Sequence, residues 1–374
     1  MRPICPDVRT ESSSSGKFIA EFLQPFVQKI PSYLGNSYEL IGKLSRISKL
    51  PDSAVLLTVD IESLYPSIPV QDALDTVKDL LLYSNNSDQE MVELIISLLD
   101  IQLRNNFFDF DGAHYRQIRG VPMGKPWAPA VACLYLLKWD CDVMAKLTSP
   151  PVLFCRYIDD VLMIFQTRHD AETCLAVMRA ANVNIKVGDS QIGSSVHFLD
   201  LNIEVNPRRH AALRGSCFAT HIFRKSCDLR VILHMQSAHD YSVKFGTVFS
   251  QVVRIWRLCS DKRAACQQIA EFIQCMRTFR GLRPRTIRKL TNKFLSWVCR
   301  EYVAGFSDPR VLAPKRMASY TKHTLCMLPR EVSRQRVNCA LRDITDRLTD
   351  SERAYVGDMR FRNITSTRLI QQFT

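Results

Sequence analysis

Two adjacent acids, Asp159 and Asp160, stand in the middle of RYIDDVLMIF (156–165), a segment that otherwise has the composition of a buried β-strand. Neighbouring carboxylates repel each other, and burying them unpaired is costly, so we expect a cation beside them. In a polar loop the usual role of Asp is to cap its own backbone in a turn. Here the apolar arms on both sides favour a rigid β-hairpin that presents the two acids at its turn.

A second apolar segment, SAVLLTVD (53–60), also ends in an acid and is predicted to be a central strand with Asp60 at its end. A Pro-containing turn and then a helix over 70–84 are predicted to follow it. If the two strands are neighbours in one sheet, Asp60 and Asp159 face each other and can bridge divalent ions. Mg²⁺ prefers oxygen ligands and leaves room for substrate phosphates. Two such ions roughly 4 Å apart catalyse phosphoryl transfer in both polymerases and nucleases. These residues alone therefore do not decide between the two activities.

The remaining segments predict an α+β region followed by helices. Residues 119–144 contain two glycines and three prolines before an apolar run, so we expect a loop and then a helix from about Pro129. Segments 196–205 and 217–225 predict short strands. After about residue 240, three apolar faces at helical spacing predict three helices, and Pro284 suits the first position of the third. These faces comprise Phe249, Val252, Val253, Trp256 and Cys259; Ile269, Phe272, Ile273 and Met276; and Ile287, Leu290, Phe294 and Val298.

Charge and composition narrow the class of partner. The chain has 50 Lys and Arg against 37 Asp and Glu, a formal net charge of +13. Residues 277–293 include seven basic residues and no acid; this can be a solvated helix face, but with the general excess it favours nucleic acid. The 13 cysteines form no CxxC pair, as in a reduced intracellular protein. No apolar run approaches the roughly 18 residues of a membrane span, so no membrane partner is expected.

Three motifs in order resemble those of reverse transcriptases. YIDD (157–160) resembles the YxDD motif, TVDIESLYPSIP (58–69) looks like motif A, and GVPMGKPWAPAVACLYL (120–136) looks like motif B. The chain is most similar to the Penelope-like retroelement reverse transcriptases, relatives of telomerase. FLDLNIEV (198–205), FRGLRPRTI (279–287) and VGDMRFRNITSTRLI (356–370) extend the resemblance over nearly the whole chain.

The resemblance implies roles for individual residues. Asp60 and Asp159 correspond to metal ligands, Asp160 to the acid beside them, and the main-chain carbonyl of Ile61 to a further ligand; the metal would be two Mg²⁺, or Mn²⁺. Nucleotide-binding positions are Arg2, Tyr65 as a steric gate against the ribose 2′-hydroxyl, Met123 and Gly124. Primer and template would contact Tyr157, Arg254, Arg257, Arg280, Arg283, Arg285, Arg288 and Lys289. Ordinary structural roles remain open for Tyr65, Gly124 and Tyr157.

The same resemblance implies a right-hand polymerase and its partners. We expect partial fingers over 1–50, a palm over 51–215 with an antiparallel sheet and packed helices, a primer grip over 216–240, a helical basic thumb over 241–330 and a C-terminal thumb extension over 331–374. An RNA template, a DNA primer and dNTPs would be the partners, and nuclear action would suit a retroelement. The motifs define no oligomeric state. Neither the first fingers motif nor the GIY-YIG endonuclease of the family is expected in this chain.

The sequence thus predicts an RNA-directed DNA polymerase that extends a primer 3′-hydroxyl by a two-metal-ion mechanism. One alternative is a catalytically incomplete, reverse-transcriptase-derived protein that only binds nucleic acid. The other is a metal-dependent nuclease that uses the same acids. In family motif B, small or aliphatic residues are more usual at the positions of Lys125 and Trp127.

Overall fold

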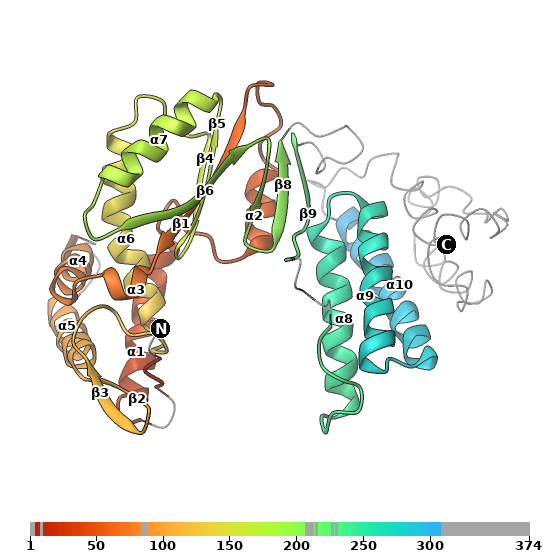
Figure 1. Ribbon diagram of the computed structural model, residues 1–374, viewed down its shortest axis with the longest axis horizontal. Coiled ribbons are helices and arrows are strands. Elements are labelled where there is room, and N and C mark those ends of the chain that lie inside the picture. The colour runs from red at the N-terminus through yellow and green to blue at the C-terminus, as the bar shows by residue number, and fades with distance from the viewer. Residues whose placement is uncertain are drawn as a thin grey trace. The chain divides into compact units, whose positions relative to one another are not determined.

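The computed structural model describes residues 4–7, 10–83, 88–205, 213, 216–225, 228 and 231–307 (Figure 1). Arg2 and the expected extension over 331–374 lie outside the described residues. The chain divides into two units: Met1–Arg208 with Arg214–Phe218, and Arg209–Leu213 with Ala219–Thr374. Within the described part of the chain, no helix combines the length and the apolar character that crossing a membrane requires.

An antiparallel four-stranded sheet forms the centre of the first unit. Its order is β4 (Leu153–Tyr157), β5 (Asp160–Phe165), β1 (Val55–Glu62) and β6 (Lys186–Gly193). Each of the two middle strands, β1 and β5, has four or more consecutive apolar or buried positions, because helices and neighbouring strands enclose them. The predicted strand at 53–60 and the predicted hairpin around YIDD are confirmed.

Helices pack against this sheet and build the core. The apolar helix α6 (Ala128–Ala145) is buried on nearly all sides, and α7 (Arg168–Ala180) lies along the sheet (Figure 1). The helices α1 (Ser13–Gln28), α4 (Val70–Tyr83) and α5 (Gln89–Arg104) contribute their apolar faces to the same core. Two shorter helices are α2 (Ser37–Leu44) and α3 (Leu64–Ser67). The predicted helices over 70–84 and from about Pro129 are confirmed within one or two residues.

Three features of the first unit differ from the sequence predictions. Segment 196–205, predicted as a strand, folds into a hairpin of β7 (Ser195–Phe198) and β8 (Leu201–Val205), in which Leu199 takes a φ of +53° at the turn. A separate hairpin of β2 (Asn106–Phe110) and β3 (Ala113–Gln117) precedes the 120–127 loop. Strand β6 was not predicted because its sequence, KVGDSQIG, has no apolar run.

The second unit contains the three predicted helices, α8 (Tyr241–Leu258), α9 (Lys262–Arg280) and α10 (Pro284–Ser307). Strand β9 (Phe218–Ile222) crosses the boundary between the units. The third helix begins at Pro284, as predicted. On α8 the predicted face is only partly correct. Val252 and Cys259 are buried as predicted, but Phe249, Val253 and Trp256 are half-buried, and the helix buries Val248, Ile255 and Leu258 instead. Two apolar stripes run along this helix, so periodicity alone could not select the buried one.

Candidate nucleic-acid polymerase site

The β4–β5 hairpin has a two-residue turn. Tyr157 pairs with Asp160, so Ile158 and Asp159 are its central residues. Ile158 has a φ of +54°, the left-handed conformation that tight hairpins require at a central position. In β5 the residues after Asp160, from Val161 to Phe165, are buried. The turn therefore holds Asp159 at its tip and Asp160 as the first residue of the strand.

Strand β1 brings Asp60 to the same place. In the antiparallel register the Cα atom of Asp60 lies opposite that of Asp160, and the N–H of Ile61 donates to the carbonyl oxygen of Asp159 at 3.1 Å. The predicted neighbourhood of the strands is confirmed. In the backbone register Asp60 lies opposite Asp160, and Asp159 is the preceding residue, in the turn. Asp159 is one of the two turn residues, so the first residue of β5 that pairs with β1 is Asp160.

The acids interact electrostatically. Burial, followed by repulsion from Asp159 and then from Asp60, raises the pKa of Asp160 to about 6. Each further negative charge nearby disfavours another, and a divalent cation would offset this repulsion. Three carboxylates with mutual repulsion therefore suit a divalent metal in their chemistry.

The acids do not form a complete set of protein ligands around a metal position. Within the residues that the structure describes, no three or more His, Cys, Asp and Glu side chains already surround a metal position. Mg²⁺ is commonly held by one or two carboxylates together with substrate phosphates, and it does not need a cage made only of protein. The residues present thus fit a metal that arrives with a phosphorylated substrate. Ile61, whose carbonyl is the predicted further ligand, has a buried side chain that fixes its strand position.

The loop over 120–127 depends on two glycines. Gly120 has a φ of +82°, and a Cβ atom there would lie 2.6 Å from Cα of Pro66; the next N–H, of Val121, donates to the carbonyl of Tyr65 at 2.8 Å. Gly124 has a φ of +106°, and its Cβ would lie 2.8 Å from the carbonyl oxygen of Cys5. Only glycine meets both demands, so the loop approaches two other backbone segments at van der Waals distance.

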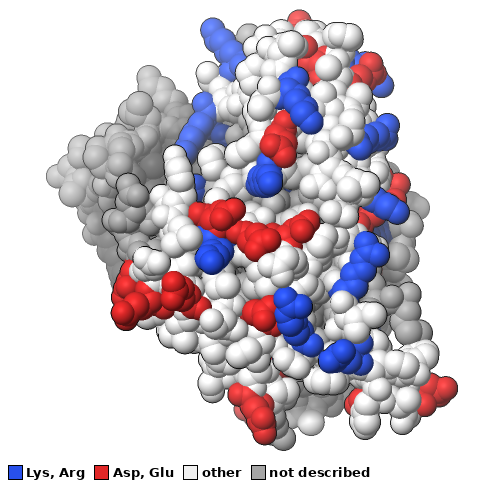
Figure 2. All heavy atoms as spheres, turned by 90° about the vertical axis from the view of Figure 1, so that its left-hand side faces the viewer, with Lys and Arg blue, Asp and Glu red and all other residues white. Residues whose placement is uncertain are grey.

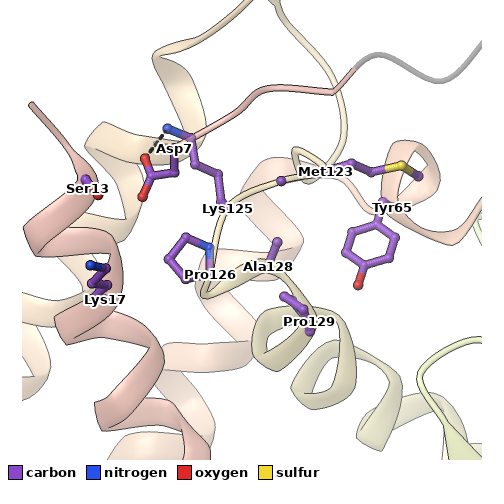
Figure 3. Close-up of a pocket in the computed structure, with 10 residues that line it drawn as sticks. Asp7, Ser13, Lys17, Tyr65, Met123, Lys125, Pro126, Ala128 and Pro129 are labelled. Atoms are coloured by element: carbon purple, nitrogen blue, oxygen red, sulfur yellow. Dashed lines mark hydrogen bonds and ion pairs between the residues drawn. The ribbon is translucent and has the colours of Figure 1, made fainter. Parts of the chain in front are cut away.

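A cavity of about 640 Å³ opens beside this loop (Figure 3). Tyr65, Met123 and Gly124, three of the four predicted nucleotide-binding residues, line it. The fourth, Arg2, lies outside the described residues. The other lining residues are Asp7, Ser13, Lys17, Lys125, Pro126, Ala128 and Pro129.

Tyr65 connects the cavity to the acids. Burial raises the pKa of its phenol, and Cys133, Asp159 and Tyr157 raise it further through their charges. The phenol therefore stays neutral at physiological pH, and it lies close enough to Asp159 to interact with it. The acid cluster and the cavity are neighbours that share Tyr65.

A buried ion pair that sequence reasoning missed anchors the loop. Nζ of Lys125 lies 2.8 Å from Oδ1 of Asp7 and 3.2 Å from the hydroxyl of Ser12, and both charged side chains are almost fully buried. Burial raises the pKa of Asp7, but hydrogen bonds from Lys125, Ser12 and Thr10 outweigh it and hold that pKa below its usual value. The unusual lysine in motif B was the only sequence signal, and it did not identify its partner.

The basic residues predicted to contact primer and template belong to the second unit. Arg257, Arg283, Arg285, Arg288 and Lys289 are exposed, and Arg254 and Arg280 are half-buried. Two of them contact aromatic rings: Arg257 lies over Trp297 at 5.0 Å from the ring centre, and Lys289 lies over Tyr241 at 5.5 Å. Tyr157, in the first unit, is half-buried at the end of β4.

Charges of both signs mix on the face of the molecule shown in Figure 2. The net charge of +13 is therefore not displayed there as a uniform basic surface. A polyanion approaching this face would meet acids as well as Lys and Arg, so its binding must depend on where the individual charges lie.

About half of the chain, which includes the candidate site, is similar to a known protein family. Residues 8–192 match the family model described as reverse transcriptase (RNA-dependent DNA polymerase). No curated protein sequence gives a significant match. The matched segment contains β1, the 120–127 loop and the β4–β5 hairpin, so the candidate site lies within the part of the chain that is similar to reverse transcriptases.

Solved structures resemble the chain at low sequence identity. Telomerase from Candida albicans, in complex with the TWJ fragment of telomeric RNA, superposes with a TM-score of 0.55 at 10% identity, covering 93% of this chain and 59% of that one. The RNA-dependent RNA polymerase of a human picorbirnavirus gives 0.48 at 12% identity, covering 72% and 53%. A truncated apo telomerase from Candida tropicalis gives 0.42 at 13% identity, covering 52% and 44%. The chain spans 44–59% of the lengths of these structures.

The likeness to the Candida albicans telomerase shows a shared fold. The α+β class predicted from the sequence, with an antiparallel sheet, packed helices and a following helical region, is confirmed.

Proposed function

We propose that this chain is an RNA-directed DNA polymerase, of the Penelope-like retroelement type, that extends a primer 3′-hydroxyl with dNTPs. One observation carries the proposal: three acids from β1 and the β4–β5 turn meet beside a cavity that Tyr65 shares with them. The similarity of residues 8–192 to reverse transcriptases supports it.

Asp60 and Asp159 would hold the metal, with Asp160 beside them and the carbonyl of Ile61 as a further ligand. Two Mg²⁺ or Mn²⁺ ions held by these residues would supply the activation of the attacking hydroxyl and the stabilisation of the leaving pyrophosphate. Burial, then repulsion from Asp159 and Asp60, raises the pKa of Asp160, and a cation bound there would offset that repulsion.

Cavity residues would position the nucleotide. The neutral, half-buried side chain of Tyr65 lines the cavity, where a ribose 2′-hydroxyl would collide with it. Gly124 has no side chain, so the substrate can approach the loop backbone closely. Met123 would lie under the nascent base pair, and Tyr157 would support the primer end. Arg2 stays a predicted contact to the triphosphate.

We assign the palm to the first unit and the thumb to the three helices of the second. Exposed Arg257, Arg283, Arg285, Arg288 and Lys289 would contact phosphates of the RNA template and DNA primer, with Arg254 and Arg280 beside them. Phosphate contacts carry little sequence information, so binding should show weak sequence preference and a steep dependence on salt.

Primer extension tests the proposal. The parent chain, Asp159→Asn and Asp111→Asn are assayed with dNTPs on RNA and on DNA templates, with Mg²⁺ or Mn²⁺. Asp111 lies in the exposed β2–β3 turn and serves as the matched control. We expect extension by the parent and by the control, and a loss of about 1,000-fold or more in Asp159→Asn, because electrostatic catalysis supplies several kcal/mol.

Two other outcomes would refute the proposal. Tight nucleic-acid binding with no extension would favour the non-catalytic binding protein. Cleavage of a labelled strand without triphosphates, abolished in Asp159→Asn, would favour the nuclease.

A further inference from the structure

Arg156, next to the catalytic turn, is a charged side chain buried in the core. It belongs to β4, and only 1% of its surface is exposed. An isolated cation in such a place would be strongly disfavoured, so its surroundings must satisfy the charge and its hydrogen-bond donors.

Asp140 on α6 supplies the counter-charge. Nε of Arg156 lies 3.1 Å from each carboxylate oxygen of Asp140, and Nη2 lies 2.7 Å from Oδ2. The hydroxyl of Ser32 donates to the same Oδ2 at 2.6 Å. The main chain of Arg156 is fixed as well, because its N–H donates to the carbonyl of Ser32 at 2.6 Å and its carbonyl accepts from Leu34 at 3.0 Å. Arg156 is therefore held rigidly at both ends.

Two further hydrogen bonds run from this fork to carbonyl groups: Nη2 donates to the carbonyl of Cys133 at 3.3 Å, and Nη1 reaches the turn. Nη1 of Arg156 donates to the carbonyl oxygen of Ile158 at 3.3 Å. Ile158 is β-branched and has a φ of +54°, a conformation that costs such residues roughly 1–2 kcal/mol and persists only where the surroundings enforce it. The next residue is Asp159, whose own carbonyl accepts from Ile61. Two hydrogen bonds, one on each central residue, thus hold the turn.

We propose that Arg156 is a positioning residue for the catalytic turn: clamped by Asp140, its guanidinium fixes the carbonyl of Ile158 and thereby the place of Asp159 opposite β1. The inference rests on the proposed function, because it takes the acids of this turn as the catalytic ones. A merely structural pair would stabilise the core without setting the order of the turn.

Arg156→Lys separates these two roles. Lysine keeps the positive charge beside Asp140, but a single ammonium group cannot hold both carboxylate oxygens and also reach the Ile158 carbonyl, as the planar fork does. If lysine does not support folding, Arg156→Met with Asp140→Leu replaces the pair by apolar side chains, an exchange that is often neutral for stability, and likewise removes the donor to Ile158.

Two variants are controls. Ser32→Ala removes one bond to Asp140 and leaves the contact between Arg156 and Ile158 intact. Thr220→Val, in the second unit, removes a buried hydroxyl that donates to the carbonyl of Leu258 at 2.7 Å. Like Arg156→Lys, Thr220→Val loses a buried hydrogen bond, but at a position that is remote in sequence from the turn.

Two readouts are independent of polymerisation. Amide hydrogen exchange is followed in peptides that cover 157–161 and Ile61, and the affinity for Mn²⁺ alone is measured by electron paramagnetic resonance. We expect at least about 10-fold faster exchange of the Ile61 amide and about 10-fold weaker Mn²⁺ binding in Arg156→Lys, the range typical of losing a group that orients a metal ligand. Both controls should behave as the parent does.

Unchanged exchange and unchanged Mn²⁺ affinity in a folded Arg156→Lys, or in the apolar double variant, would overturn the inference. A parent that extends no primer would instead refute the proposed function, and the exchange of the turn would still show whether Arg156 orders it.

Discussion

Two irregular segments flank the proposed site, the β4–β5 turn and the 120–127 loop, and they reach left-handed backbone conformations by different means. The turn does so with a β-branched residue, Ile158 at a φ of +54°, whereas the loop does so with Gly120 at +82° and Gly124 at +106°. The turn must be held in place by neighbouring donors. The loop needs the absence of side chains, because other backbone occupies the space where they would be.

Each segment is also tied to a buried ion pair, and the two pairs differ in how completely they are satisfied. Arg156 engages both oxygens of Asp140 and two carbonyl groups besides. Lys125 engages one oxygen of Asp7, and the other oxygen, Oδ2, is buried and has no hydrogen-bond partner among the residues that the structure describes. The turn should therefore be disturbed when the Arg156 donor is lost. The loop should be disturbed when a side chain is added at its glycines or when the Lys125 cation is removed.

The largest stability effect is expected at the ion pair of the loop. Lys125→Met leaves Asp7 buried without its cation and should lower the free energy of unfolding by about 3–5 kcal/mol. Adding Asp7→Asn removes the buried charge and should restore most of that loss. Urea unfolding measures both, and a single variant as stable as the double would contradict the assigned role of this pair.

The pH dependence of the same variants gives a second test. Because the pKa of Asp7 is held below its unfolded value of about 3.9, its contribution is fully present above that pH and is lost as the pH falls toward the folded pKa. Between neutral pH and about pH 3, the parent should therefore lose more stability than the double variant.

Adding one methyl group to the loop should cost slightly less. Gly120→Ala forces a left-handed alanine against the backbone of Pro66, which should destabilise the protein by about 2–4 kcal/mol. Gly42→Ala is the control: Gly42 lies in α2 with nothing within 4 Å of an added Cβ, so alanine should stabilise the helix by about 0.5–1 kcal/mol. Equal effects on the melting temperature would refute the steric account of the loop.

At the acids, removing a charge should stabilise the protein. The pKa of Asp160 is raised to about 6, so the folded state loses stability as the pH rises from about 4, where the unfolded chain ionises, to about 6. Asp160→Asn removes this loss and should add up to about 1 kcal/mol at pH 7, after allowance for solvent screening. Mg²⁺ should raise the melting temperature of the parent more than that of the variant. A destabilised Asp160→Asn would contradict the raised pKa of Asp160.

The smallest change in the free energy of unfolding is expected when glycine replaces the left-handed residue of the turn, the opposite of the exchange at Gly120. Ile158→Gly relieves the left-handed strain but loses a half-buried apolar side chain and adds the flexibility of glycine. These contributions nearly cancel, so the free energy of unfolding should change by less than about 1 kcal/mol. A loss as large as that of Gly120→Ala would mean that turn and loop do not differ as described.

Local patterns predicted much of the fold. Apolar runs identified β1 and the β4–β5 hairpin, and helical spacing identified α4, α6 and the three helices of the second unit, because each of these buries a contiguous apolar stripe. Strand β6 escaped prediction because it lies at the sheet edge and has few buried positions. The β7–β8 turn escaped because Leu199, an unusual residue for a left-handed position, forms it.

The sequence predicted which residues form the candidate site, but it did not predict which residues contact one another there. Motif spacing indicated Asp60, Asp159 and Asp160, yet only the register showed that Asp60 lies opposite Asp160. Arg156 with Asp140, and Lys125 with Asp7, are pairs that bridge 16 and 118 residues of sequence. No periodicity in a single sequence encodes such long-range partners, because they depend on how the elements pack.

A crystal structure soaked with Mn²⁺ and a dNTP, with anomalous scattering recorded for manganese, tests the central claim most directly. We expect manganese bound by the carboxylates of Asp60 and Asp159, with the nucleotide in the cavity against Tyr65 and Gly124. Manganese and nucleotide found apart from each other, or an acid cluster that binds no metal while the cavity holds the nucleotide, would contradict it.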